Sequence, residues 1–408
     1  MHPSALTPNP GGQLSPDSIL GRDELIAHLW QILEGRSIYM NDLRRIGKTQ
    51  IMVKMHAFPP LGWHSVKRDL GGFHTAAEFA TRVYLDTAAV LGTQKRILRG
   101  MASLIGQAAG AEIAGVIKLP DGKVAPWKEV LFRTFTDLEH EMASLETETG
   151  RPARMVFFWD EIPFLLDNVS RREGPAVAME ILDVLRAFGQ DHDHIRLVLT
   201  GSIGIHHILA ALRAEGHNHS PLNRMEHVSP GPLAAADART LALCLLTGAG
   251  TRCAQPDICA QAIADSVGNV AFYIHKLISR LPTHEQITPA FIDRCLVREI
   301  TANERDDWDF AHYSNRLKPY YGDHTPLALA VLDAAACAAP ATPPDFTALR
   351  AAVAASVSGF HDDEKLRSLL KLLCRDHYLV RDEHGVYRFY LELIRRWWAI
   401  DRALVPSA

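Results

Sequence analysis

The chain has 408 residues, which is long for one domain and predicts two or three. Its composition, 47% hydrophobic and 22% charged, is typical of a globular protein. The formal net charge of −4 argues against a protein covered by nucleic acid, although it is compatible with a local basic face. The six cysteines form no Cys-x-x-Cys pair, which disfavours a zinc ribbon or a redox pair and favours a reducing, cytoplasmic setting.

The N-terminal stretch MHPSALTPNPGGQLSPDS does not have the basic segment and apolar core of a signal peptide. It is rich in Pro, Gly and Ser, which predicts a flexible tail over residues 1–17. No apolar run is long enough to span a bilayer, so we expect no membrane partner.

Strands and helices are predicted to alternate after this tail, from the spacing of apolar residues. The expected strands are 37–40, 64–70, 154–161, 195–202 and 224–229. The expected helices are 21–35, 49–58 and 176–190, with residues 75–150 mostly helical around a loop near 119–127. This alternation predicts an α/β fold, with a parallel sheet covered on both faces.

The pattern changes after Pro232. Helices are expected at 233–250, within 256–280, and at 289–300, 365–377 and 391–404, with a turn or linker at 338–346. YLVRDEHGVYRFY (378–390) predicts a hairpin around Gly385, so the C-terminus is expected to be a winged helix. The predicted domains are a core over 18–232, a helical lid over 233–325 and a winged-helix domain over 326–408.

Between the first strand and the second helix lies DLRRIGKTQ, which resembles a phosphate-binding loop. In such a loop Gly47 lets the backbone approach an anion, Lys48 reaches the β- and γ-phosphates, and Thr49 binds Mg²⁺. Asp42 stands where the pattern has glycine, but Asp tolerates turn conformations, so the loop can survive. The predicted nucleotide-binding residues of the loop are Asp42, Leu43, Arg44, Arg45, Ile46, Gly47, Lys48, Thr49 and Gln50.

A second motif, RMVFFWDE, follows about 110 residues later and ends a predicted buried strand with two acids. Asp160 is expected to hold Mg²⁺ through water, and Glu161 to orient or deprotonate the attacking water. IRLVLTGS ends a third strand, where Thr200 or Ser202 is expected to sense the γ-phosphate. Together these motifs predict ATP and Mg²⁺ as ligands and ATP hydrolysis as the activity.

The motifs resemble those of the archaeal and bacterial predicted ATPases, which lie between the AAA+ and STAND groups of P-loop ATPases and are related to origin-recognition ATPases. The segments that carry this resemblance are LRRIGKT, FFWDEIPFLL, LVLTGS, SPLNRMEHVSPGPL and GNVAFYIHKL, in that order. ILGRDEL is similar to the family's entry motif, which implies that Gly21 and Arg22 lie near the adenine. GNVAFYIHKL is similar to the lid motif, from which Asn269 and Ala271 depart.

Arginine fingers are the least defined part of the predicted site. Arg224, just before the fifth strand, is the first candidate and Arg196 the second. A finger acting in trans would imply a homo-oligomer, because the charge comes from a neighbouring subunit.

The winged helix could bind DNA or a protein client, and its sequence favours protein docking or a regulatory role over DNA. Lys365, Lys371 and Arg375 could contact phosphates, but acids precede them in the sequence and the net charge of the region is close to zero. Of the adjacent Trp397 and Trp398, we expect one in the core and the other at an interface.

Three functions are compatible with these patterns: an ATPase that acts on a client or DNA, a slowly hydrolysing nucleotide switch in defence or regulation, and a scaffold that has lost nucleotide binding. The histidine clusters at 191–194, 206–207 and 216–220 do not have the spacing of a zinc site. We expect them to be surface histidines in loops.

Overall fold

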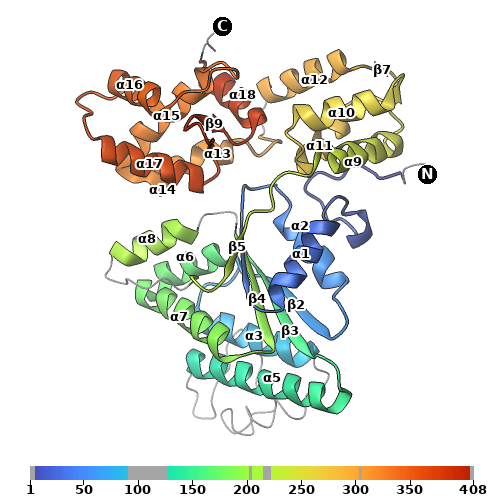
Figure 1. Ribbon diagram of the computed structural model, residues 1–408, viewed down its shortest axis with the longest axis vertical. Helices are drawn as coiled ribbons and strands as arrows, with labels where there is room; N and C mark the ends of the chain where they lie inside the picture. The colour runs from blue at the N-terminus through green and yellow to red at the C-terminus, as the bar shows by residue number, and fades with distance from the viewer. Residues whose placement is uncertain (1–4, 91–125, 202–204, 215–221, 303–305, 405–408) are drawn as a thin grey trace. The chain divides into compact units, whose positions relative to one another are not determined.

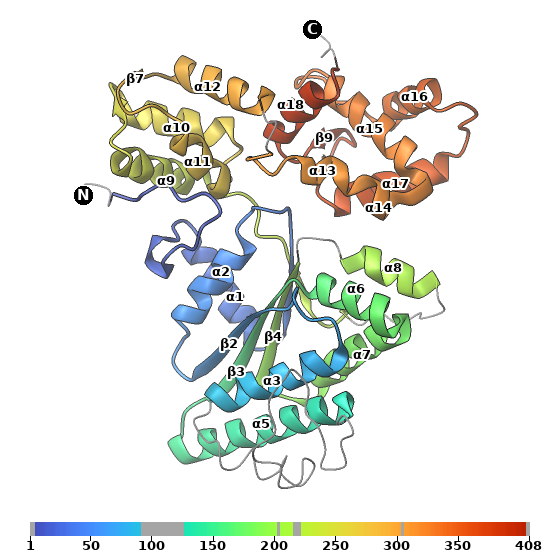
Figure 2. The same cartoon turned by 180° about the vertical axis from the view of Figure 1, so that it is seen from behind.

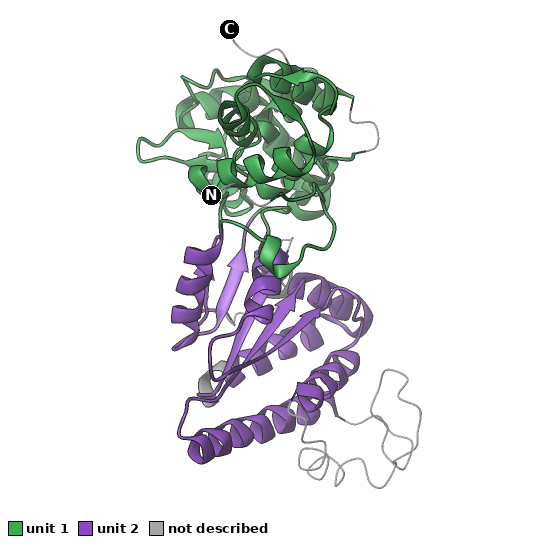
Figure 3. Ribbon diagram, turned by 90° about the vertical axis from the view of Figure 1, so that its right-hand side faces the viewer, with its two compact units in different colours: residues 1–21, 43–47, 231–408 green, residues 22–42, 48–230 purple. Residues whose placement is uncertain are grey.

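The computed structural model describes residues 5–90, 126–201, 205–214, 222–302 and 306–404. Its contacts divide the chain into two compact units, coloured separately in Figure 3. Unit 1 contains residues 1–21, 43–47 and 231–408, and unit 2 contains residues 22–42 and 48–230. The chain therefore leaves unit 2 for five residues in the middle of the predicted phosphate loop.

Unit 2 is built on a parallel sheet with the strand order β2-β3-β4-β1-β5 (Figures 1 and 2). The strands are β1 (Ile38–Asn41), β2 (Trp63–Asp69), β3 (Arg154–Asp160), β4 (Ile195–Gly201) and β5 (Glu226–Val228). All five overlap the strands predicted from sequence. The predicted α/β class and parallel sheet are confirmed.

The helices of unit 2 lie on both faces of this sheet (Figures 1 and 2). They are α1 (Asp23–Leu33), α2 (Lys48–Ala57), α3 (Ala76–Val90), α5 (Trp127–Thr149), α6 (Ile162–Glu173), α7 (Pro175–Asp191) and α8 (Ile205–Ala214). Of the loop predicted near 119–127, all but the last two residues lie outside the described ranges.

Strand β3 shows why the sheet must be covered on both sides. Successive side chains of a strand point to opposite faces. Phe158 packs with α1 and α2 residues such as Trp30 and Met52, whereas Phe157 and Trp159 join a second core on the opposite face. All three β3 aromatics are at most 1% exposed. Burying each such side chain stabilises the fold by about 1.5–3 kcal/mol.

Unit 1 contains the predicted lid and winged-helix segments around one hydrophobic core. The lid helices are α9 (Ala235–Gly248), α10 (Pro256–Ser266), α11 (Ala271–Ser279) and α12 (Pro289–Thr301), with the short parallel strands β6 (Arg252–Cys253) and β7 (Gln286–Ile287). The short helices α13 (Ala311–Asn315) and α14 (Leu317–Tyr321) follow.

The C-terminal segment has the helix and hairpin order of a winged helix. Its elements are α15 (Thr325–Cys337), α16 (Phe346–Ser356), α17 (Asp363–Arg375), the antiparallel pair β8 (Leu379–Arg381) and β9 (Tyr387–Phe389), and α18 (Glu392–Asp401). Gly385 turns the hairpin at a φ of 82°, in the left-handed region that glycine adopts without steric cost. The side chain of Asp362 caps α17, accepting a hydrogen bond from the Lys365 N–H at 2.9 Å.

The tryptophan pair of α18 differs from the prediction. Trp397 is 4% exposed and Trp398 is fully buried, so neither offers an interface. Trp397 packs on Phe310, with ring centroids 5.5 Å apart. The Trp398 indole donates to Asp333 at 2.9 Å. Both rings are buried because α15 and the segment before α13 pack on different sides of α18, which helical periodicity alone does not reveal.

The N-terminal segment also differs from the predicted flexible tail. Within unit 1, Leu6 is hydrogen-bonded to α9 and Asn9 to α11. The Leu6 N–H donates to Cys244 O at 3.1 Å. The Asn9 N–H donates to His275 Nδ1 at 3.1 Å. Backbone hydrogen bonds of this kind depend on partners far along the chain, so a Pro- and Gly-rich composition did not predict them.

Candidate nucleotide site

The candidate site lies at the carboxyl ends of three neighbouring strands of unit 2. β1 is hydrogen-bonded to β4, and β4 to β3, all in parallel, so Asn41, Gly201 and Asp160 end at one edge of the sheet. In open α/β sheets this edge is where ligands bind. The phosphate loop leaves β1 here and leads into α2 at Lys48.

Asp160 is the centre of the polar contacts at this edge. Its Oδ2 atom accepts a hydrogen bond of 2.5 Å from Thr49 Oγ1, and its Oδ1 atom accepts one from Thr200 Oγ1. Asp160 is 6% exposed and Thr200 is fully buried. The structure thus brings together the three residues that sequence predicted as separate motifs. Ser202, the alternative to Thr200, lies outside the described residues.

Lys48 is buried, at 7% exposure, and its ammonium group donates to the backbone carbonyl of Asp42 at 2.7 Å. This bond spans the loop from its first residue to its end. A buried ammonium group is costly unless it is hydrogen-bonded, and the Asp42 carbonyl supplies such a bond to Lys48.

The backbone of the loop answers the question posed by Asp42. Among the described residues, positive φ values in this loop occur at Arg45 (69°) and Gly47 (105°), and Asp42 is not among them. The missing glycine therefore imposes no left-handed strain at Asp42. The residue that bears such strain is Arg45, which costs roughly 1–2 kcal/mol for a non-glycine residue. The sequence pattern placed Arg45 in the loop but carried no signal for this conformation.

Glu161 follows Asp160 directly and has an unusual backbone for a glutamate. It occupies the N-cap of α6 with a φ of 58°, and its N–H contacts Asp160 Oδ1 at 3.1 Å. A non-glycine residue at positive φ is uncommon, and such strain tends to occur at functional sites. Glu161 therefore lies in the turn between β3 and α6, at the carboxyl end of the strand where a ligand is predicted to bind.

Five of the predicted loop residues differ in burial and in their partners. Leu43 and Ile46 are at most 2% exposed and belong to the hydrophobic core of unit 1. Arg44 and Arg45 pair with Asp309, also in unit 1. In unit 2, Gln50 has a buried Oε1 atom without a hydrogen-bond partner among the residues that the structure describes. A buried acceptor of this kind is a candidate contact for a ligand.

The entry motif has two different local roles. Gly21 has a φ of 69°, and a Cβ atom there would lie 2.6 Å from the Asp237 Cβ, so the position requires glycine. Arg22, in unit 2, is 6% exposed and donates to Pro230 O at 3.1 Å. The position of either residue relative to an adenine remains a prediction.

Both candidate arginine fingers lie near the amino-terminal ends of their strands, whereas the phosphate loop follows a carboxyl-terminal end. Arg196 is 9% exposed and donates to backbone carbonyls, including Leu33 O at 3.0 Å and Ile195 O at 2.8 Å. Burial lowers the pKa of its guanidinium. Arg224 is exposed and precedes β5, so it lies at the amino-terminal edge of a parallel sheet whose phosphate loop is at the other edge. For Arg224, a role in trans remains a prediction.

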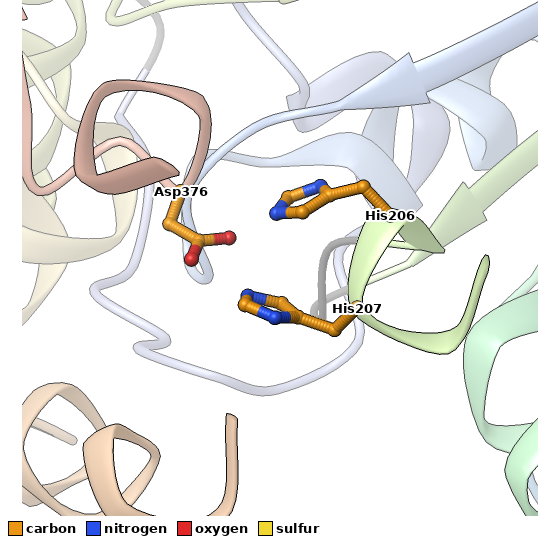
Figure 4. Close-up of side chains that lie close together, drawn as sticks. All are labelled: His206, His207 and Asp376. Atoms are coloured by element: carbon orange, nitrogen blue, oxygen red, sulfur yellow. The ribbon is translucent and has the colours of Figure 1, made fainter. Parts of the chain in front are cut away.

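The histidines were expected in surface loops, and this is wrong for one pair. Figure 4 draws His206 and His207, which lie in helix α8 with ring centroids 4.4 Å apart. The same figure draws Asp376 of unit 1, whose carboxylate accepts a hydrogen bond of 2.6 Å from Tyr321 Oη. The cluster at 216–220 lies outside the described residues.

No protein-family model and no curated protein matches the chain. Among solved structures, the Walker-type ATPase PABY2304 of Pyrococcus abyssi is similar over 94% of this chain and 96% of its own, with a TM-score of 0.63 and 14% identity. The Aeropyrum pernix ORC2 protein matches over 94% and 92%, with a TM-score of 0.47 and 13% identity. The Thermotoga maritima RuvB branch migration motor matches over 95% of each chain, with a TM-score of 0.36 and 14% identity.

No helix in the described ranges is long and apolar enough to cross a membrane. The similarity to the Pyrococcus ATPase extends over nearly the whole of both chains, so it includes the sheet, the lid segment and the C-terminal segment. The resemblance predicted from the motifs is thereby confirmed for the fold: the chain shares the fold of this Walker-type ATPase, an α/β unit followed by helices α9–α12 and a C-terminal segment with the element order of a winged helix.

Proposed function

We propose that this chain binds ATP with Mg²⁺ in the loop of residues 42–50 and hydrolyses the β–γ bond. The observation that carries the proposal is the carboxylate of Asp160, which bonds Thr49 with one oxygen and Thr200 with the other. Three motifs far apart in sequence thus meet at one buried acid. An ordinary strand end with two solvated acids would not need this arrangement.

The donor set at this edge fits a magnesium ion. Thr49 offers a hydroxyl oxygen and Asp160 a carboxylate oxygen, and Mg²⁺ prefers such hard oxygen ligands, often with retained waters. Bound Mg²⁺ would neutralise charge on the phosphate oxygens. Lys48 binds and orients the same anion, and Glu161 accepts the proton of the attacking water. Thr200 keeps Asp160 oriented by its hydrogen bond.

The test is a titration of the purified protein with ATP, with Mg²⁺ and with a chelator in its place, followed by measurement of phosphate release. We expect ATP binding that saturates and phosphate release that depends on Mg²⁺. A protein that binds no ATP under either condition would refute the proposal and favour a scaffold without nucleotide.

Thr200→Val is expected to lower phosphate release about tenfold, because the Asp160 carboxylate loses a buried donor and its orientation. The lost hydrogen bond is also expected to reduce the free energy of unfolding by about 1 kcal/mol. Steady-state phosphate release and thermal unfolding measure the two effects. Thr200→Ser keeps the hydroxyl and is the matched control. A Val variant as active as the Ser variant contradicts the role of this bond.

A slowly hydrolysing nucleotide switch is the second candidate function, and the arginines favour it for an isolated chain. The Arg196 guanidinium already donates to backbone carbonyls, and Arg224 precedes β5, at the amino-terminal ends of the strands. An arginine supplied to the transition state raises turnover by several orders of magnitude in related chemistry. Slow turnover that rises steeply with protein concentration would indicate a finger in trans and a homo-oligomer. Slow turnover at every concentration would indicate a switch.

The winged helix is proposed to carry the nucleotide state to a partner, DNA or a protein client. Helix α17 exposes Arg367, Lys371 and Arg375 at four-residue spacing, which puts them on one face. Lys365, named from sequence, is half-buried, and Arg367 was missed. The acid Asp362 caps the helix, so its charge is partly used within the fold. This face supports DNA as the first partner to test.

Changing Arg367, Lys371 and Arg375 together to alanine is expected to weaken binding of duplex DNA at least tenfold. It should also reduce the slope of log affinity against log salt by up to about 3, since each phosphate contact contributes about 0.9. Fluorescence anisotropy at several salt concentrations measures both quantities. The matched control removes Arg239, Arg294 and Arg298, exposed arginines of the lid helices. Equal losses in both variants would indicate non-specific attraction, and no binding by wild type would favour a protein client.

A further inference from the structure

Asp309 of unit 1 holds both arginines of the phosphate loop. Its Oδ2 atom accepts a hydrogen bond of 2.6 Å from Arg44 Nε and one of 2.9 Å from Arg45 Nε. The side chain of Asp309 is 19% exposed, and those of the arginines are 39% and 33% exposed. One carboxylate oxygen thus ties two consecutive loop residues to the segment between the lid and the winged helix.

The segment that carries Asp309 is itself held in place. Asp309 has a φ of 60°, and its N–H donates to Asp306 O at 2.8 Å. The Asp306 carboxylate accepts the Phe310 N–H at 2.7 Å. Trp308 and Phe310, on either side of Asp309, are at most 1% exposed and pack on Tyr273 of α11. These contacts restrict the position of the Asp309 backbone.

The loop, in contrast, contains a conformation that needs support. Arg45 has a φ of 69°, which residues other than glycine, Asn and Asp seldom adopt. Its guanidinium lies over the Phe272 ring, 4.5 Å from the centroid, and bonds Asp309. Both contacts hold the side chain of a residue whose backbone would otherwise tend to relax.

We propose that Asp309 is a positioning residue for the nucleotide site: by holding Arg44 and Arg45 it keeps the phosphate loop in the shape that binds ATP. The inference rests on the proposed function. In this proposal Arg44 and Arg45 hold the loop by bonding Asp309. Loop arginines without such a partner would instead be expected to bind the phosphates directly. Nucleotide affinity then depends on the segment that joins the lid to the winged helix, because that segment carries the anchor.

Asp309 could also weaken ATP binding, and this opposite expectation determines which result supports the proposal. A carboxylate near the loop is an anion that competes with phosphates for the same guanidinium groups. If competition dominated, removing Asp309 would tighten ATP binding. If positioning dominates, as we propose, removing it weakens ATP binding.

Asp309→Gly tests this, because glycine accepts the positive φ and removes only the side chain. We expect the Kd for ATP to rise about tenfold and KM to rise with it, while kcat at saturating ATP stays within twofold, since the loop is remade by bound nucleotide. Asp309→Asn keeps a hydrogen-bond acceptor and is expected to lie between Gly and wild type. Asp307→Ala is the matched control, because Asp307 lies in the same segment as Asp309 but pairs with Arg280 and Lys276.

A double-mutant cycle with the pair Arg44→Ala/Arg45→Gly tests whether Asp309 acts through these arginines. In that background both contacts of Asp309 with the loop are absent, and glycine at 45 adopts the left-handed conformation without support, so Asp309→Gly is expected to change Kd by less than threefold. A tenfold effect that persists in this background would overturn the proposal, as would tighter or unchanged binding in Asp309→Gly alone.

Amide hydrogen exchange of residues 43–50 gives a readout that does not require nucleotide. We expect faster exchange in Asp309→Gly than in Asp307→Ala, and equal exchange would overturn the positioning role. Failure of the proposed function has a different signature. In that case wild type binds no ATP, although its loop amides are still more protected than those of Asp309→Gly.

Discussion

Glu161→Gln is expected to reduce ATP hydrolysis by about two orders of magnitude while leaving ATP binding within threefold of wild type. The amide keeps the size of the side chain but cannot accept the proton of the attacking water, and general-base catalysis contributes about 10²–10⁴ in rate. Single-turnover phosphate release and equilibrium ATP binding measure the two quantities separately.

Asp167→Asn is the control for this change, because Asp167 lies on the same helix and pairs with Arg171 at 2.9 Å. It is expected to hydrolyse ATP like wild type. If Glu161→Gln hydrolyses ATP at the wild-type rate, Glu161 is not the base and its left-handed turn has another purpose.

Lys48→Ala is expected to weaken ATP binding at least a hundredfold, and to abolish hydrolysis at any practical ATP concentration. The change removes a buried ammonium group that is hydrogen-bonded across the loop, so it deletes both the charge for the phosphates and a contact that closes the loop. Isothermal titration with ATP measures the loss of affinity, and circular dichroism checks that the fold is retained.

Lys54→Ala is the matched control, since Lys54 lies on α2 as well and pairs with Asp23 at 2.6 Å. It removes the same charge from the same helix away from the loop. Comparable losses in the two variants would mean that the overall charge of α2, not the loop lysine, governs binding.

The sheet and the three motifs at its edge could be predicted from sequence because their signals are local. Buried strands such as RMVFFWD have a continuous apolar run, and parallel strands bring their carboxyl ends together. This geometry explains why Asp160 and Thr200, 40 residues apart, are hydrogen-bonded. The register of neighbouring strands thus turns three separate patterns into one site.

The partners of the loop arginines could not be predicted, because Asp309 is 264 residues from Arg45 and nothing local relates them. DDWDF does show an acid between two aromatic residues, which indicates an anchored turn, but not what the acid contacts. For the same reason helical spacing assigned one of Trp397 and Trp398 to a surface, whereas both are buried by distant segments. The expectation that the loop tolerates Asp42 agrees with its backbone, which has no positive φ at that residue.

Residues 43–47 belong to unit 1 although their neighbours in sequence belong to unit 2, and this has a consequence for biosynthesis. Leu43 and Ile46 are synthesised early, but the core that buries them is formed by residues beyond 230. At roughly 5–20 residues per second, Asp309 is added some tens of seconds after Arg45. During that interval the emerging chain exposes two apolar side chains in its loop, where a chaperone could recognise them. The loop of the candidate nucleotide site is therefore expected to reach its final contacts late, and ATP is expected to bind only once the residues around Asp309 have been synthesised.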